Sequence, residues 1–357
     1  MIKTKSSKIR ENALRRPESE IVFLKRKDRL KPYLIDKMDD YIFRDLSDAF
    51  FKNTAVVELM HNVSVPFRRE DLLEEATKGA NESDEIPIQV LMENMTCVIG
   101  MDPHFRYSEV YVAFLLHTMG KNVGHTIAKS AKKYAQNGMY EDAVIRYRAS
   151  LACDPFYLDA MYGYARVCRE LYLVSSDPDK TGNLKAEALD YFELLTEIFP
   201  DYNSGYYYLG YMYLNMGLYV KAEIVWREYM RLSTSPKTPA KDKKEIRERL
   251  RQIQGPVEIE HGYNAILRGS YEEGIEMLEP FINSDFNDWW PLYYYLGIGY
   301  METARAEEAI ASFKKVLQRN ASHLESMQEL ADIYQAQGDK VNAEKYTKKM
   351  EIVKNGL

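Results

Sequence analysis

The stretch Asn203–Trp226, NSGYYYLGYMYLNMGLYVKAEIVW, decides the fold, because its spacing of small and large residues recurs along the chain. Gly210 is followed twelve residues later by Ala222, and the large Trp226 comes four residues after that. Gly217, seven residues after Gly210, stands where a first helix would end in a left-handed residue. A single copy of this pattern would not identify a fold. Whether the many tyrosines of this stretch belong to a core or to a binding surface depends on whether the pattern repeats along the chain.

Pairs of small residues twelve positions apart occur five times in the sequence: Ala131 with Ala143, Gly210 with Ala222, Gly262 with Gly274, Gly297 with Ala309, and Ala331 with Ala343. Two antiparallel helices joined by a short turn pack closely only if each has a small side chain where they cross. A large residue after the second small residue then fills the groove toward the neighbouring unit: Tyr147, Phe192, Trp226, Leu278 or Phe313. The spacing predicts helix–turn–helix units.

A glycine ends the first helix in four of these units, at Gly138, Gly217, Gly269 and Gly338, and Ala304 replaces it in a fifth. A sixth pair, Ala165 and Ala188, is separated by eleven extra residues. The segment SSDPDKTGN between them is rich in turn-forming residues, so the excess is interpreted as a loop.

These residues resemble tetratricopeptide repeats, whose period is 34 residues. Ala131 to Ala165 is 34 residues and Gly297 to Ala331 is also 34. The resemblance covers residues 124–357, about two thirds of the chain. It implies a solenoid that binds peptides or partner proteins on a concave surface.

We therefore expect an all-α fold, a right-handed α-solenoid of about six such repeats preceded by an irregular helical N-terminal region. A charged segment with Ile246, Leu250 and Ile253 at helical spacing predicts an extra helix in the middle of the array, or else a linker at which the array bends. The expected segments are a basic arm at 1–33, irregular helices or a cap at 34–123, repeats one to three at 124–236, the extra helix at 237–254, and repeats four to six at 255–357.

Composition places the chain among soluble folded proteins, with 46% hydrophobic and 29% charged residues. Cys97, Cys153 and Cys168 show no paired spacing, and the N-terminus lacks the apolar stretch of a secretory signal. The longest apolar run, Val110 to Leu116, is far shorter than a bilayer span. We expect a cytoplasmic protein without a membrane segment.

Charge is distributed unevenly, since residues 1–31 carry a net charge of +7 and the remainder carries −13 of the total of −6. Such an arm permits electrostatic contacts with nucleic acid or an acidic protein surface. The alternative, which we favour, is a solvated tail that folds back on its own acidic body. The candidate contacts in the arm are Lys25, Arg26, Lys27, Arg29 and Lys31.

The resemblance also implies which side chains would face a binding groove, because the first helix of each repeat lines the concave surface. This phase selects a basic, tyrosine-rich set: Lys129, Lys132, Tyr162, Arg166, Arg169, Tyr207, Tyr208, Tyr211, Tyr263, Tyr294 and Tyr295. The last repeat contributes Glu325, Glu329 and Asp332. The alternative is that several of these tyrosines only pack against adjacent repeats.

Sequence motifs of common enzymes are missing: there is no G-x-S-x-G, no phosphate-binding G-x-x-x-x-G-K-[ST] and no H-E-x-x-H. The few histidines and cysteines have no zinc-ligand spacing. We therefore expect a non-enzymatic adaptor with no cofactor and no metal.

The favoured function is a scaffold for an unidentified protein or peptide, held in the tyrosine-rich groove. Two alternatives are a peptide-responsive regulator and a nucleic-acid-associated factor that uses the basic arm. Nucleic acid is the less favoured partner, and self-association through exposed tyrosine-rich surfaces stays open.

Overall fold

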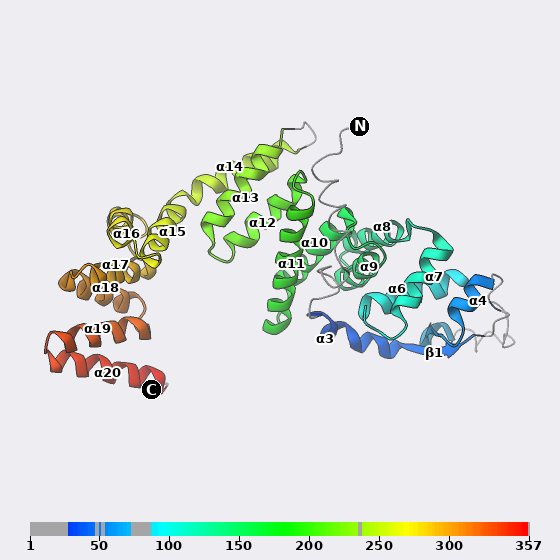
Figure 1. Cartoon of the computed structure of the whole chain (residues 1–357), viewed down its shortest axis with the longest axis horizontal. Helices are drawn as coiled ribbons and strands as arrows, with labels where there is room; N and C mark the ends of the chain where they lie inside the picture. The colour runs from blue at the N-terminus through cyan, green and yellow to red at the C-terminus, as the bar shows by residue number, and fades with distance from the viewer. Residues whose placement is uncertain (1–27, 47–49, 51–53, 73–86, 235–237, 356–357) are drawn as a thin grey trace. The chain divides into compact units, whose positions relative to one another are not determined.

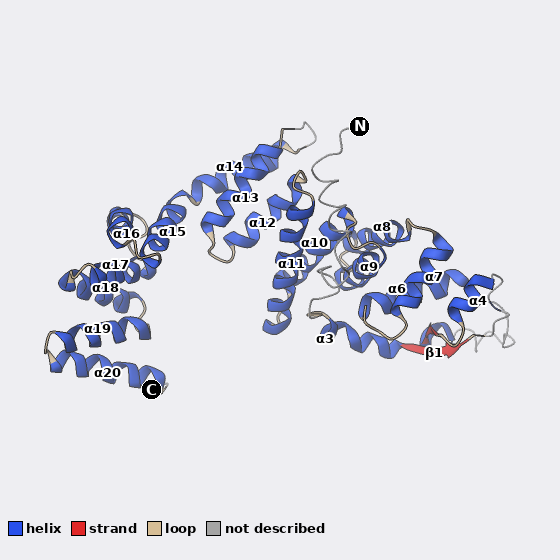
Figure 2. Ribbon diagram, viewed as in Figure 1, coloured by secondary structure: helices blue, strands red, loops and turns tan. Residues whose placement is uncertain are grey.

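Helices form most of the protein in the computed structural model, which describes residues 28–46, 50, 54–72, 87–234 and 238–355 (Figure 1). The chain divides into two compact units, unit 1 up to Leu209 and unit 2 from Gly210 onward. Figure 2 shows helices in blue through both units, with strand colour only near the N-terminal part of unit 1. The predicted all-α fold of tetratricopeptide-type helix pairs is confirmed.

Unit 1 begins with irregular elements: α3 (Lys31–Leu34), the 3-10 helix η2 (Ile35–Asp40), β1 (Tyr41–Asp45), α4 (Thr54–Met60), β2 (Ser64–Arg68), α6 (Ile88–Met101) and α7 (Ser108–Met119). β1 and β2 pair antiparallel, from Tyr41 opposite Arg68 to Asp45 opposite Ser64. The prediction of irregular helices at 34–123 was therefore wrong at these strands. Burial overrode local helical spacing, because Val65 and Phe67 of β2 are buried and Asn94 of α6 donates to the Pro66 carbonyl.

The repeats of unit 1 follow as antiparallel pairs, α8 (Val123–Gln136) with α9 (Tyr140–Cys153) and α10 (Leu158–Val174) with α11 (Pro178–Ile198), and then the start of α12 (Asn203–Leu214). The expected loop in SSDPDKTGN was wrong, since only 175–177 separate α10 from α11. Asp177 caps α11 by accepting from the N–H groups of Asp179 and Lys180, and Pro178 occupies the first helical position. The extra residues lengthen the helices instead.

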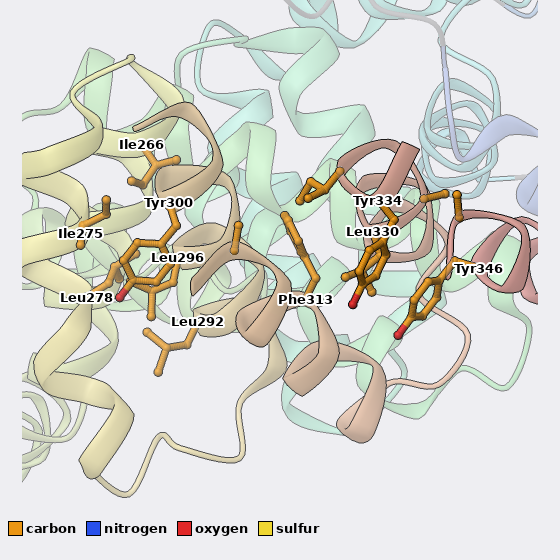
Figure 3. Close-up of a cluster of buried hydrophobic side chains, with 14 of the residues drawn as sticks. Ile266, Ile275, Leu278, Leu292, Leu296, Tyr300, Phe313, Leu330, Tyr334 and Tyr346 are labelled. Carbon is orange, nitrogen blue, oxygen red and sulfur yellow. The ribbon is translucent and has the colours of Figure 1, made fainter. Parts of the chain in front are cut away.

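Unit 2 contains the end of α12, then α13 (Tyr219–Leu232), α14 (Ala240–Gln252), α15 (Gln254–Leu267), α16 (Tyr271–Leu278), the 3-10 helix η4 (Glu279–Asn283), α17 (Trp290–Glu302), α18 (Ala306–Arg319), α19 (Leu324–Ala336) and α20 (Lys340–Lys354). The predicted extra helix is confirmed as α14, with Ile246 and Ile253 buried. Figure 3 shows the core of the last repeats, where Leu278, Leu296, Phe313 and Leu330 are fully buried.

Small residues let the paired helices approach, as predicted. A Cβ added to Gly210 would lie 2.1 Å from the Trp226 indole nitrogen, and one added to Gly297 would lie 2.7 Å from Phe313. In both cases the large residue covers the glycine of its own helix pair. At other repeats the large residue reaches toward the neighbouring unit as predicted, because Tyr147 of α9 fills the space beside Gly163 of α10 and Phe192 of α11 stacks on Tyr208 of α12.

The predicted glycines end the first helices in the left-handed conformation. Their φ angles lie between 72° and 84°, at Gly138, Gly217, Gly269 and Gly338. Ala304 takes the same conformation at φ 60° although it carries a Cβ. The repeat geometry therefore imposes this turn even where glycine is missing.

Candidate functional site

A cavity of about 590 Å³ lies in unit 1 among α8, α9, α10 and the residue before α12. Its polar lining includes Lys129 and Lys132 of α8 and Arg166 of α10. Its aromatic lining consists of Tyr140, Tyr147, Tyr157, Tyr162 and Tyr202. A cavity of this size is large enough for one or two side chains of a bound peptide.

The cations of this cavity have no ionic partner in the part of the chain that the structure describes. Lys129, Lys132 and Arg166 are exposed and form no ion pair there. Of the two carboxylates of the lining, Glu170 pairs with Arg169 at 2.9 Å, whereas Asp159 accepts from the neutral Tyr157 hydroxyl at 3.1 Å and keeps its charge. Three cations beside one such carboxylate leave the cavity with an excess of positive charge.

Aromatic rings hold Arg166 in place at the cavity wall. Its guanidinium carbon lies 5.7 Å from the ring centre of Tyr162 and 5.3 Å from that of Tyr208. Burial alone would lower the pKa of Arg166, but these two tyrosines and Glu170 outweigh it and raise the pKa. Arg166 therefore stays charged while part of its side chain is shielded from water.

The tyrosines of the wall support one another. Tyr162 meets Tyr202 edge-on at 5.4 Å, and Tyr208 stacks on Phe192 at 5.6 Å. Burial raises the pKa of Tyr162, so its hydroxyl is neutral. These contacts restrict the rings to few orientations, which lowers the entropy lost on binding.

The cavity floor depends on a close approach between two helices. A Cβ on Gly163 of α10 would lie 2.2 Å from the ring of Tyr147 of α9, so only glycine leaves room for this tyrosine. Burial raises the pKa of Tyr147 to about 12. The phenol is therefore a neutral hydrogen-bonding group at the bottom of the cavity.

The predicted groove residues fall into separate groups. Lys129, Lys132, Tyr162 and Arg166 line the cavity in unit 1. The neighbouring Arg169 lies over the Tyr208 ring at 5.5 Å, and Tyr207 lies edge-on to Tyr208 at 5.1 Å. The unit 1 residues that the helical phase selected therefore line this cavity or contact the Tyr208 ring.

In unit 2, Tyr211 packs with α13 and α14. Its hydroxyl donates to Glu245, and its ring lies edge-on to Trp226 at 5.0 Å. Tyr263 and Tyr295 stack on each other at 4.7 Å, and Tyr294 lies edge-on to Tyr295 at 5.5 Å. A binding role for these four tyrosines stays a prediction.

Tyr157 and Tyr202 line the cavity but were missed from sequence. Each stands immediately before a first helix of a repeat, α10 or α12. Aromatic residues precede later first helices as well, with Trp289 before α17 and His323 before α19. This repeated position was a signal available in the sequence.

The end of the basic arm is bound to unit 1. Arg29 forms ion pairs with Glu187 at 3.2 Å and Asp190 at 2.6 Å of α11, and Lys31 pairs with Asp102 at 2.7 Å. Two of the five candidate nucleic-acid contacts are therefore engaged with carboxylates of the protein itself. The other three, Lys25, Arg26 and Lys27, lie outside the described residues.

Cys97, Cys153 and Cys168 are free thiols, and burial is the main cause of the raised pKa of each. Within the described ranges, no three His, Cys, Asp or Glu side chains converge as metal ligands would. No helix in the same ranges has the length and apolar character needed to cross a membrane.

No protein-family model and no curated protein matches the sequence. Among solved structures, the chain is similar to MamA, with 19% identity over 51% of this chain and 98% of that chain and a TM-score of 0.30. A tetratricopeptide repeat protein from Parabacteroides merdae matches at 17% identity over 84% and 94%, with a TM-score of 0.30. PilW, a type IV pilus biogenesis factor, matches at 16% over 63% and 90%, with a TM-score of 0.29. Because these scores are low, the repeat assignment rests on the helix spacing and turns described above.

Proposed function

We propose that the protein is a non-enzymatic scaffold that binds a partner protein or peptide, and that the unit 1 cavity receives an acidic side chain of that partner. The supporting observation is the charge state of the cavity. Lys129, Lys132 and Arg166 have no ionic partner among the described residues, and of the two lining carboxylates Glu170 pairs with Arg169, so that cations outnumber free carboxylates in the lining. A carboxylate would supply the missing partner.

The tyrosines around these cations define the rest of the proposed ligand. Tyr157, Tyr162 and Tyr202 present large rings beside the charged groups. Tyrosine and arginine dominate binding energy at protein interfaces because they bury much area and bond directionally. We expect the acidic residue of the partner to be followed by an aromatic or aliphatic residue that packs on these rings.

Arg166 is the residue whose charge matters most in this proposal. Arg166 is exposed like Lys129 and Lys132, but the Tyr162 and Tyr208 rings lie beside its guanidinium, so a carboxylate bound to it would be less screened than one bound to either lysine. Hydrogen bonds to charged groups contribute about 1.5–3 kcal/mol, whereas exposed ion pairs contribute about 0.2–1 kcal/mol. Arg166 should therefore dominate the affinity.

The proposal is tested by fluorescence anisotropy with a short labelled peptide of alternating Glu and Leu and its Gln-for-Glu analogue. We expect the acidic peptide to bind and Arg166→Gln to weaken it about tenfold, equivalent to about 1.4 kcal/mol. Lys133→Gln is the matched control, because Lys133 is exposed on the same helix as Lys129 but does not line the cavity. Equal binding of the Gln analogue, or an unchanged affinity in Arg166→Gln, would contradict the proposal.

A further inference from the structure

A second surface lies in unit 2 on α15, α17 and α19, the first helices of the last repeats, which Figure 1 labels. It combines stacked tyrosines with carboxylates that form no ion pair among the described residues. We call it the aromatic–acidic face, and it consists of Tyr263, Tyr294, Tyr295, Glu302, Glu329 and Asp332. It lies outside the unit 1 cavity and has the opposite charge.

The aromatic part of this face is a continuous set of rings from two helices. Tyr263 of α15 stacks on Tyr295 of α17 with ring centres 4.7 Å apart and planes 20° apart. Tyr294 lies edge-on to Tyr295 and also edge-on to His323, at 5.0 Å from the latter. All three tyrosines are half-buried, so each keeps part of its ring available to a ligand.

The acidic part of the face lacks neutralising cations. Glu329 is half-buried and, among the residues described, has no ion pair or hydrogen bond through its carboxylate. Burial, and then Asp332 and Glu302, raise the pKa of Glu329, so its charged neighbours are carboxylates. Within the described ranges, Asp332 accepts hydrogen bonds only from the neutral amide of Gln328, at 2.9 and 3.0 Å.

Rings and carboxylates of this face lie within electrostatic reach of one another. Burial raises the pKa of Tyr294, with Glu329 and Glu325 as the next causes. His323 connects the rings to the acidic helix, because its ring lies 5.0 Å from that of Tyr294, its Nε2 lies 3.6 Å from Glu325 and its Nδ1 accepts from the Ser326 N–H. Burial lowers the pKa of His323, which opposes the charged form that would neutralise Glu325. Some other carboxylates of unit 2 do have a cationic partner, such as Glu279 and Glu308, which pair with Arg305.

Like charges placed together without a partner cost free energy, and a cation would remove that cost. The faces of tyrosine rings attract cations as well, most strongly where water is partly excluded. Tyrosine rings and carboxylates on one surface are therefore complementary to a side chain that is both long and positively charged. Lysine and arginine have an apolar stem that packs on rings and a charged end that reaches a carboxylate.

We infer that the aromatic–acidic face docks a lysine- or arginine-bearing segment of a partner protein, with the cation between Tyr294 and Glu329. This inference goes beyond the proposed function, because it concerns a different unit and a ligand of opposite charge. A partner of the full chain would then place an acidic side chain in the unit 1 cavity and a lysine or arginine side chain on the aromatic–acidic face of unit 2.

The test uses the full chain and three short labelled peptides with the same sequence, alternating Ala with lysine, trimethyllysine or acetyllysine. We expect lysine and trimethyllysine peptides to bind and the acetylated peptide to bind at least about fivefold more weakly, because acetylation removes the charge. Glu329→Gln should weaken the lysine peptide by a similar factor and leave the acidic Glu–Leu peptide unaffected. Glu276→Gln, on the exposed surface of the second helix α16, removes the same charge as a matched control.

Several outcomes would overturn this inference. Equal binding of the acetylated peptide, or equal losses in Glu329→Gln and Glu276→Gln, would show that only the general acidity of the protein is involved. A large gain in lysine-peptide affinity when Lys25, Arg26 and Lys27 are replaced by Glu would identify the chain's own arm as the occupant, and a partner protein would be excluded. Circular dichroism spectra of each variant separate loss of binding from loss of fold.

Discussion

At the residue scale, single positions show how strongly the repeat geometry constrains the backbone. Gly138, Gly217, Gly269 and Gly338 take the left-handed conformation that their sequence positions predict. Ala304 was identified from sequence as the departure, but that it would adopt φ 60° could not be predicted, because local preference opposes it. The packing of α17 against α18 therefore imposes the left-handed conformation on Ala304 at the turn between them.

The strain at Ala304 predicts that Ala304→Gly raises the free energy of unfolding by about 0.5–1 kcal/mol, since glycine removes the Cβ conflict at positive φ. Ala311→Gly is the opposite control, because Ala311 is exposed inside α18 and glycine there costs about 1 kcal/mol. Urea unfolding followed by circular dichroism measures both. A destabilised Ala304→Gly would contradict the strain at this turn.

Close approach at Gly210 predicts a larger effect of one added methyl group. Gly210→Ala should lower stability by about 1–3 kcal/mol, because Trp226 is fully buried and cannot move aside. Gly182→Ala, in open space inside α11, should instead be neutral or stabilise by about 0.5–1 kcal/mol. Scanning calorimetry compares the two, and equal effects would contradict the helix-crossing argument.

At the scale of elements, the segment around α3 ties the irregular N-terminal region to the repeats. Asp28 accepts from both Nη atoms of Arg148, a residue of α9 whose side chain is 4% exposed. Arg148 also donates to the carbonyl of Gly100 in α6 at 2.6 Å. This connection joins residues far apart in the sequence, so no local pattern could predict it.

Removing the carboxylate at this connection should destabilise unit 1 strongly. We expect Asp28→Asn to cost about 3 kcal/mol, because Arg148 would be left as a buried charge without its partner. Arg29→Gln is the milder comparison, since the Arg29 side chain is 30% exposed and its ion pairs are partly screened. Chemical denaturation of unit 1 distinguishes the two, and similar costs would contradict the buried connection.

The same contact predicts how stability depends on pH. Burial alone would raise the pKa of Asp28, but hydrogen bonds from Arg148 and the N–H groups of Lys31 and Leu30 outweigh it and lower the pKa. A lowered pKa in the folded state stabilises the protein above the ordinary value of 3.8, and this contribution is lost as pH falls below it. Denaturation midpoints should therefore fall more steeply below this pH in the natural chain than in Asp28→Asn, and parallel pH profiles would refute the contribution.

At the scale of the whole molecule, the repeat period predicted the helix pairs of 123–232 and 254–354 because it is set by contacts close in sequence. The sequence did not predict β1 and β2, because burial by distant segments decides where these strands form. It also did not predict that Tyr157 and Tyr202 line the cavity, because packing between repeats brings them there. The predicted segment boundaries, with arrays at 124–236 and 255–357, stay a proposal, as do a cytoplasmic location and self-association.

The most direct test of the central claim is hydrogen–deuterium exchange of the full chain with and without a saturating acidic Glu–Leu peptide. The unit 1 cavity predicts slower exchange in α8 and α10, which carry Lys129, Lys132 and Arg166, and no such change in Arg166→Gln. Protection confined to other helices, or the same protection in Arg166→Gln, would contradict the assignment of this cavity as the binding site.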